Sequence, residues 1–324
     1  MFWPLISQWL APGGSNGKLS IFIFHRVLPQ TDPLLPFEPS AEQFDWIVRF
    51  ISRTFTVLPL GEAASRLKEG TLPPAAATIT FDDGYADNLL VAWPILKRYE
   101  IPATFFIATA FLEGGRMWND DVIEAFRLSG KEQLDLSEFD LGIHPLKDTA
   151  SRIKGYEAVL GKLKYYEHRL RSDIAGEIAR RCEVPKQSEL MMTHRQLRLL
   201  HHEGAEIGGH TRTHPILERL DDTSALQEIE AGKQELEALV GAAVRVFAYP
   251  NGVPGRDCSA RHAEMARRAG FEAAVSTRQA CATPASDIFQ LPRFTPWDRT
   301  PLKFAMRSMM NLWGNPPIFS SGQK

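Results

Sequence analysis

Short apolar runs alternate with amphipathic helical segments along most of the chain. Residues 19–24 (LSIFIF) and 76–81 (AATITF) are apolar almost throughout, which predicts strands buried on both faces. Between the strands, apolar residues recur at helical spacing, as in residues 44–51 and 223–240. Strands separated by helices predict right-handed crossovers and a parallel sheet, and roughly seven such units favour a closed or nearly closed barrel. Further strands are expected near residues 56–58, 103–108, 206–208, 244–248, 273–276 and 289–291.

Capping patterns mark two of the helix starts. Ser40 with Gln43, and Thr193 with Gln196, each place a hydroxyl and an amide at the spacing of a capping box. Residues 111–192 interrupt the alternation of strands and helices. We therefore expect an inserted, mostly helical region there, covering the barrel mouth or serving as a structural cap.

The two ends of the chain lie outside this alternation. We expect an N-terminal amphipathic segment over residues 1–18, a barrel over 19–300, and a C-terminal helix and tail over 301–324. Both end segments are consistent with packing against the barrel or with lying on a membrane surface. Their apolar stripes are Phe2, Leu5, Ile6, Trp9 and Leu10 in the first, and Leu302, Met306, Met309, Met310 and Trp313 in the second.

Composition narrows the class of protein. Hydrophobic residues make up 44% and charged residues 23%, as in soluble globular chains with a sizeable core. A formal net charge of -2 gives no reason to expect a nucleic-acid partner. The widely spaced Cys182, Cys258 and Cys281 argue against a disulfide framework or a cysteine-bound zinc. With no secretory signal and no membrane-spanning run, we expect a cytoplasmic protein, with peripheral membrane contact left open.

Reactive side chains follow the predicted strands. In a parallel barrel the C-terminal ends of the strands meet at one rim, which is where catalytic groups lie. This shared position predicts a single reactive site at that rim. The residues concerned are His25, Asp82, Asp83, His210, His214, Tyr249, Pro250 and Arg293.

Three of these residues predict a metal site. His210 and His214 are four residues apart, a spacing at which two imidazoles can reach one ion. Asp83 would be the third ligand, leaving positions open for water and substrate, and we expect the ion to be Zn²⁺. Adjacent residues of a strand point to opposite faces, so Asp82 and Asp83 can both face the site only if the chain turns after the strand. Gly84 permits such a turn. Either motif alone also fits a simple turn or surface histidines, but their coincidence at strand ends favours the metal site.

Two segments resemble motifs of the polysaccharide deacetylase family, the NodB-like group also called carbohydrate esterase family 4. They are residues 80–85 (TFDDGY) and 209–215 (GHTRTHP), and residues 247–252 (FAYPNG) resemble the third motif. The resemblance covers residues 19–293 in outline. It implies an α/β fold of the distorted (β/α)7, TIM-like barrel type, here with a helical insertion.

The resemblance also implies roles for individual residues. Asp82 matches the family's catalytic base, and the metal ligands match Asp83, His210 and His214. Ala248 stands where the family's third motif carries an arginine, and Leu291-Pro292-Arg293 stands where a late motif carries a histidine. Arg293 is therefore expected either to hold Asp82 or to be an ordinary surface arginine.

The residues at the start of the barrel suggest a different proton donor. Phe24-His25-Arg26-Val27 is similar to a motif of the subgroup that deacetylates poly-N-acetylglucosamine, in which the histidine supplies the acid. We accordingly expect His25 to protonate the leaving amine. A backbone N–H near Tyr249 and Pro250 is expected to stabilise the oxyanion. Trp118, Tyr249 and Trp297 are expected to stack on sugar rings or to pack in the core.

These assignments predict a metal-dependent N-deacetylase. It would hydrolyse the acetamide of an N-acetylated amino sugar in a polysaccharide, oligosaccharide or glycolipid, with a lipid-linked precursor the easiest to reach. One alternative is a deformylase or amidase acting on another substrate. Others are a non-catalytic glycan-binding relative and a non-haem iron oxygenase, which also uses two histidines and one carboxylate.

Overall fold

Parallel strands form the centre of the molecule. The computed structural model describes residues 2–185, 189–296 and 298–314, to which all structural statements refer. Its main sheet has eight strands in the order β1-β3-β4-β7-β8-β9-β10, with β2 paired to β3. Every pairing in it is parallel, as the alternating pattern predicts. The strands are β1 (Leu19–Phe24), β2 (Thr56–Val57), β3 (Ala76–Phe81), β4 (Thr104–Ile107), β7 (Glu206–Gly209), β8 (Val246–Ala248), β9 (Ala273–Gln279) and β10 (Leu291–Arg293).

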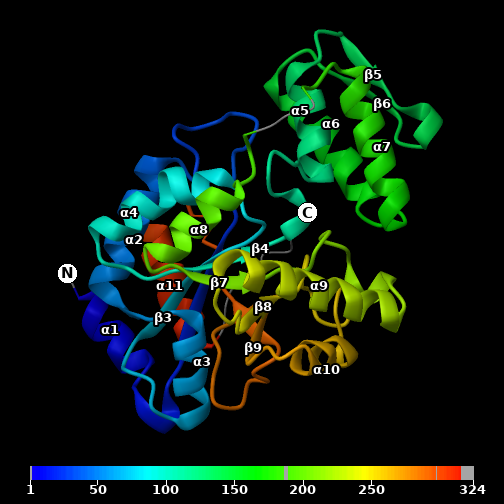
Figure 1. The fold of residues 1–324 in the computed structure, drawn as a ribbon. Helices are drawn as coiled ribbons and strands as arrows, with labels where there is room; N and C mark the ends of the chain where they lie inside the picture. Colours follow the sequence, from blue (N-terminus) through cyan, green and yellow to red (C-terminus); the bar gives the residue numbers. More distant parts are fainter. Residues whose placement is uncertain (1, 186–188, 297, 315–324) are drawn as a thin grey trace.

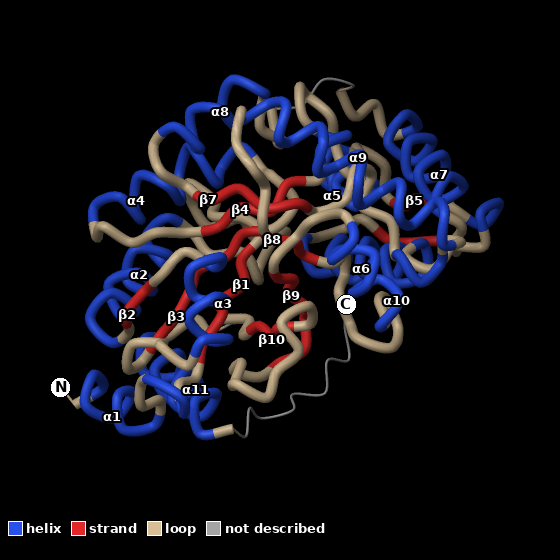
Figure 2. The backbone as a smooth tube through the Cα atoms, turned by 60° about the horizontal axis from the view of Figure 1, so that its bottom comes forward, coloured by secondary structure: helices blue, strands red, loops and turns tan. Residues whose placement is uncertain are grey.

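The sheet closes on itself where the last strand meets the first. Directly after β10, the Phe294 N–H donates to the Ile21 carbonyl at 2.7 Å, and the Ile23 N–H donates to the Phe294 carbonyl at 3.1 Å. In Figure 2 the strands lie in the middle of the molecule with helices around them. The predicted barrel fold is thus confirmed.

Helices cover the outside of the barrel. The predicted capping boxes at Ser40 and Thr193 are both present, each with reciprocal hydrogen bonds to the glutamine three residues on. A π-helical turn at Asn88–Ala92 precedes α4 and continues directly into it. The barrel helices are α2 (Ala41–Thr54), α3 (Leu60–Glu69), α4 (Trp93–Arg98), α8 (His194–His202), α9 (Asp222–Val240) and α10 (Ala260–Arg268).

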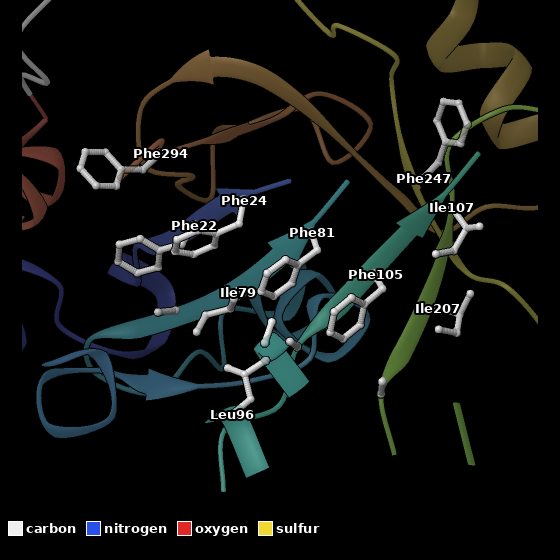
Figure 3. Packing of buried hydrophobic residues seen from close by; sticks show 14 of the residues in the cluster. Phe22, Phe24, Ile79, Phe81, Leu96, Phe105, Ile107, Ile207, Phe247 and Phe294 are labelled. Atoms are coloured by element: carbon white, nitrogen blue, oxygen red, sulfur yellow. The ribbon is translucent and has the colours of Figure 1, made fainter. Parts of the chain in front are cut away.

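Aromatic side chains fill the space between the strands and the helices (Figure 3). The Phe81 ring stacks on Phe105 with centroids 4.8 Å apart and on Phe24 with centroids 5.5 Å apart. Phe44 from α2 meets both Phe24 and Phe81 edge-on. Burying one such side chain contributes about 1.5–3 kcal/mol, so this aromatic row fixes β1, β3 and β4 relative to one another.

The last strand differs from its predicted position by two residues. The apolar pattern predicts a strand at 289–291, whereas β10 spans Leu291–Arg293 and carries Arg293 into the barrel interior. A charged residue is normally excluded from such a position unless it is paired. Arg293 is paired there, as described below, and that pairing is invisible in the hydrophobic pattern.

The predicted insertion has a hydrophobic core of its own and lies to one side of the barrel (Figure 1). Val122, Phe126, Val159 and Ile178 are fully buried in it. It is less purely helical than expected, because β5 pairs with β6 in an antiparallel sheet. Its elements are α5 (Trp118–Leu128), β5 (Gln133–Asp135), β6 (Ile143–Pro145), α6 (Thr149–Leu163) and α7 (His168–Arg181).

The two terminal helices, α1 (Trp3–Leu10) and α11 (Pro301–Trp313), contact each other and both contact α2. The Ser7 hydroxyl donates to the Thr54 carbonyl at 2.8 Å, which ties α1 to the end of α2. Phe304 of α11 is fully buried against Trp46 and Phe50 of α2. None of the helices in the described ranges has the length and apolarity needed to span a bilayer. Residues 315–324 of the predicted tail lie outside the described residues.

Candidate metal centre and active site

A sharp turn after β3 brings two adjacent aspartates to the same rim. The strand ends at Phe81, and Asp83 and Gly84 then adopt left-handed backbone angles, with φ of 78° and 95°. The turn includes Asp83 itself, not only Gly84 as the sequence predicts. The Met192 N–H donates to the Gly84 carbonyl at 3.0 Å, so the segment that returns from the insertion supports this turn.

Asp83, His210 and His214 converge with their ligand atoms facing one another. Asp83 Oδ1 lies 3.4 Å from the Nε2 atoms of both His210 and His214. Two ligands bound at about 2.1 Å to a tetrahedral ion are separated by about 3.4 Å, so these separations fit a metal site. Asp83 Oδ1 is also buried and has no hydrogen-bond partner among the described residues, which is the condition of a ligand atom reserved for a cation. All three ligand atoms lie within 4.8 Å of one another.

The pKa values of Asp83 and His214 suit metal ligands, whereas for His210 burial lowers the pKa but the neighbouring Asp83 and Asp82 raise it above its usual value. The His210 Nδ1 lies 2.7 Å from the Ala248 carbonyl at the end of β8, and that contact leaves Nε2 as the atom for the ion. Burial lowers the pKa of His214 to about 3, which keeps its ring neutral at pH 7. Burial opposes ionisation of Asp83, but the facing His210 and His214 outweigh it and hold the pKa of Asp83 below its usual value.

One face of α9 holds the loop that carries the two histidines. Glu228, Gly232 and Glu235 recur at helical spacing and therefore lie on that face. A Cβ atom at Gly232 would lie 2.7 Å from the Thr211 backbone, so only glycine lets the loop lie so close to the helix. Arg212 donates to both glutamates, from its N–H to Glu228 at 3.0 Å and from Nε to Glu235 at 2.8 Å.

The same loop is conformationally strained. Thr211 and His214 have φ of 62° and 56°, in the left-handed region, which is unfavourable for residues other than glycine. The Thr211 hydroxyl accepts a hydrogen bond from the His214 N–H at 3.1 Å and stabilises this backbone. Strain of about 1–3 kcal/mol per residue is characteristic of functional sites.

Asp82 stands beside the metal cluster without belonging to it. Arg293 donates from Nη1 and Nη2 to the two Asp82 oxygens, both at 2.7 Å. Both residues are almost completely buried, and the Arg293 Nε is satisfied by the Ser276 carbonyl at 3.0 Å. Burial raises the pKa of Asp82, but the charges of Arg293 and His210 lower it further, so the pKa lies below its usual value. Of the two expectations for Arg293, the structure agrees with the one in which it holds Asp82.

His25 follows β1, and the Asp82 N–H donates to the carbonyl of the preceding residue, Phe24, at 3.0 Å, so His25 leaves its strand beside the two aspartates. The Asn88 side chain donates to the His25 carbonyl at 2.8 Å. The next residue, Arg26, pairs with Asp87 at 2.8 Å. Both contacts come from the segment after β3, so the loop of His25 is fixed against the loop of the two aspartates.

Sequence comparison agrees with this arrangement. The profile described as Polysaccharide deacetylase matches residues 69–134 and 151–274, together more than half of the chain. The chain belongs to the polysaccharide deacetylase family. Poly-beta-1,6-N-acetyl-D-glucosamine N-deacetylase of Staphylococcus aureus is 31% identical over 119 residues, which are 36% of this chain and 41% of that protein. The chain thus spans about two fifths of the length of the curated relatives it matches.

Solved structures share the fold. Streptococcus pyogenes deacetylase PplD, determined in complex with acetate, superimposes with a TM-score of 0.60 at 18% identity, covering 86% of this chain and 92% of that one. IcaB from Ammonifex degensii gives 0.56 at 19% identity, covering 93% and 97%. At these identities the likeness extends to the fold alone, and it agrees with the barrel of this family member.

Two of the expected substrate contacts do not fit the structure. Tyr249 is buried, and its hydroxyl donates to the Phe289 carbonyl at 2.9 Å, so its ring is part of the core and cannot stack on a sugar. Its N–H donates to the Val275 carbonyl at 3.3 Å, and Pro250 has no N–H. Neither residue can therefore supply the expected oxyanion N–H. Asn251, with φ of 59°, is the next residue that has one.

Trp118 lies at the start of α5, half-buried, with the Arg171 guanidinium 4.8 Å from its ring centroid. One of its faces is therefore used inside the insertion rather than offered to a sugar. Trp297, the third expected stacking residue, lies outside the described residues.

Sequence reasoning missed a buried polar group between the insertion and the barrel. The Tyr85 hydroxyl donates to Asp120 at 3.1 Å, and Arg26 lies 4.8 Å from the Tyr85 ring centroid. Burial raises the pKa of Asp120 to about 7, with the charge of Asp83 adding to the effect. The only sequence signal was an acidic residue close to the start of a predicted insertion, which is too common to single out.

Proposed function

We propose that this protein hydrolyses the acetamide of an N-acetylated amino sugar in a polysaccharide, oligosaccharide or glycolipid. The observation that carries the proposal is a buried carboxylate, Asp82, held by Arg293 next to a separate three-residue cluster that could hold a metal. The Asp82 Oδ2 lies 4.0 Å from His210 Nε2, so a base and a metal site share one rim. A site built only to bind glycans would not need both.

Asp83, His210 and His214 would hold the cation, and we propose Zn²⁺ because one carboxylate and two imidazoles leave its remaining coordination open. When bound, such an ion lowers the pKa of water from about 16 towards about 7 and polarises the amide carbonyl.

The remaining steps belong to the protein's own side chains. Asp82 accepts a proton from the attacking water, whose oxygen bonds to the acetamide carbon. His25 then donates a proton to the nitrogen as the C–N bond breaks, so an amine departs together with acetate. We assign the Asn251 N–H to the developing oxyanion, in place of the N–H groups near Tyr249.

An acetate-release assay tests the proposal. The purified protein is incubated with N-acetylglucosamine oligomers and with N-acetylated glycolipids, with and without a chelator. Acetate release that the chelator stops and Zn²⁺ restores is the expected result. Release of formate from N-formyl analogues alone would replace the proposal with a deformylase, and no release from any substrate despite bound metal would overturn it.

We also propose that the substrate is met at a membrane surface, because the terminal helices form one exposed apolar face. Trp9 and Trp313 are 76% and 71% exposed, and α1 and α11 contain no acidic residue. Arg49 and Arg53 lie on the same side of α2 as Phe50, which packs against α11, and supply positive charge for anionic lipid. The other exposed residues of this apolar face are Phe2, Leu5, Ile6, Leu302, Met306 and Met310. The cytoplasmic location expected from the sequence stays a prediction.

Vesicle sedimentation tests this surface. We expect the protein to sediment with vesicles containing phosphatidylglycerol, and we expect Trp9→Ser with Trp313→Ser to weaken binding about tenfold or more. Leu199→Ser, at an exposed leucine of α8, is the matched control and should not change binding. If the double variant instead dissociates a dimer seen by sedimentation velocity, the face binds a second copy of the chain and the membrane proposal is wrong.

A further inference from the structure

A chain of hydrogen bonds runs from the core of the insertion to the loop that carries His214. Arg171 Nη2 lies 2.9 Å from His168 Nδ1, His168 Nε2 lies 3.0 Å from the Thr213 hydroxyl, and that hydroxyl donates to Glu228 at 2.7 Å. Figure 1 shows α7, which carries the first two residues, above α9, which carries Glu228. The sequence gives no sign of this chain, since His168 reads as a solvated or structural histidine.

Donor and acceptor rules allow only one arrangement of protons along this chain. A guanidinium can only donate, so His168 Nδ1 must accept from Arg171. The ring proton is then on Nε2, which donates to Thr213, and the Thr213 hydroxyl proton goes to Glu228. Arg171 therefore fixes a neutral, Nε2-protonated His168, and each of the three hydrogen bonds in the chain has one donor and one acceptor.

Arg171 is a buried arginine without a carboxylate partner among the described residues, which is unusual. It is 2% exposed, and no carboxylate within the described ranges lies within ion-pair distance of it. Its guanidinium stacks on Trp118 and makes a long contact of 3.4 Å with the Lys164 carbonyl, and its Nε has no partner among the residues that the structure describes. Burying an unpaired charge is costly, so a residue held this way has a role that stability alone does not supply.

The two metal-binding histidines differ in how they are oriented. His210 is fixed directly, by its Nδ1 contact with the Ala248 carbonyl. His214 Nδ1 is buried and has no partner in the described part of the chain. The His214 ring lies edge-on against the His210 ring and otherwise takes its position from its backbone, which is held by Thr213 and by the loop contacts to Glu228.

We propose that the insertion positions the second metal histidine: Arg171 fixes His168, and His168 holds Thr213 and hence the loop of His214. Arg171 and His168 are positioning residues, since neither reaches the reacting atoms. The inference rests on the metal-site part of the proposed function. It makes the insertion part of the metal centre and not only a cover for the barrel mouth.

The test measures metal affinity rather than activity. Zn²⁺ affinity is determined by competition with a chromophoric chelator for the full-length protein and for His168→Phe, Thr213→Val and the double variant. Loss of an outer hydrogen bond to a metal ligand typically weakens affinity by about 10–100-fold, and we expect about tenfold for each single variant. Both variants break the contact between His168 and Thr213, and Thr213→Val also removes the Thr213–Glu228 bond, so the double variant should bind no more weakly than Thr213→Val alone.

His144→Phe is the matched control. His144 also belongs to the insertion, but its Nε2 contacts the Leu141 carbonyl and its ring lies against Phe126, so affinity should not change. Nitrogen NMR of His168 supplies a second readout, in which Arg171→Met should abolish the preference for the Nε2-protonated tautomer.

The outcomes separate the two hypotheses. If the unaltered protein binds no Zn²⁺, the metal site and with it the proposed function fail. If it binds Zn²⁺ but the His168 and Thr213 variants bind equally well, only the positioning role is wrong. A variant that lowers the unfolding temperature of the metal-free protein but leaves the Zn²⁺ affinity unchanged would also show that the positioning role is wrong.

Discussion

The rim of the barrel and the core of the insertion are stabilised in opposite ways. At the rim, Asp82, Asp83, His210 and Arg293 are polar and buried, and residues such as Asp83 and Thr211 adopt strained backbone angles. The insertion is held by ordinary apolar packing among α5, α6 and α7. The rim is therefore costly to form and depends on the barrel around it. The insertion has an apolar core of its own, and it meets the barrel through apolar contacts such as Tyr85 with Met117 as well as through polar ones.

The largest effect is expected at the rim. Asp82→Asn removes the proposed base and should lower the rate of acetate release by about 10³-fold or more, while bound Zn²⁺ is retained. It also leaves Arg293 with a buried charge that has lost its ionic partner, which lowers stability. Metal content and circular dichroism of the variant show whether the fold survives, and a variant with metal and near-normal turnover would remove Asp82 from the mechanism.

Ile178→Ala tests whether the insertion is independent. The residue is fully buried in the core of the insertion, and its truncation should cost about 2–5 kcal/mol. Hydrogen exchange should speed up in α5, α6 and α7 while the amides of β3 and β7 stay protected. Faster exchange spread evenly over the barrel would mean that the two regions unfold as one.

His25→Ala separates proton donation from metal binding. We expect turnover to fall by about 10²-fold, because the amine would leave unprotonated, with Zn²⁺ affinity unchanged. Steady-state acetate release and chelator competition on the same preparation measure both quantities. Unaltered turnover would exclude His25 as the acid.

A pair of glycine variants gives the smallest effect and contrasts the two regions directly. Alanine is favoured over glycine in helices by about 1 kcal/mol, so Gly176→Ala on α7, which has open space around it, should stabilise the protein. Gly232→Ala on α9 should destabilise it by about 1–2 kcal/mol, because the added Cβ meets the Thr211 backbone. The free energy of unfolding of both variants is measured by denaturant titration. Equal changes would mean that the loop of Thr211 moves away from α9 to make room for the added Cβ.

The sequence predicts the barrel better than it predicts the environment of the site. The strands over 19–24 and 76–81 match the structure residue for residue, because a continuous apolar run has few other places to lie. The rim positions of Asp83, His210 and His214 follow from strand ends in the same way. The local pattern of apolar residues along the chain is sufficient to predict both these strands and the positions of the three residues at the rim.

Contacts between distant segments explain what the sequence could not predict. Arg293 lies inside β10 because Asp82, 211 residues away, accepts its charge. Tyr249 was expected to face substrate, yet its hydroxyl finds the Phe289 carbonyl in the core. Asp120 and Arg171 become notable only once the insertion is folded against the barrel, since each derives its environment from burial.

The pairing of Arg293 with Asp82 also bears on how the protein is made. Asp82 is synthesised early and its partner more than two hundred residues later, on the strand that closes the barrel. A chain that has not yet reached β10 lacks the Arg293 guanidinium that pairs with both oxygens of Asp82. The proposed catalytic site is therefore complete only once the final strand is docked, and we expect a truncation before Leu291 to leave Asp82 without its guanidinium partner.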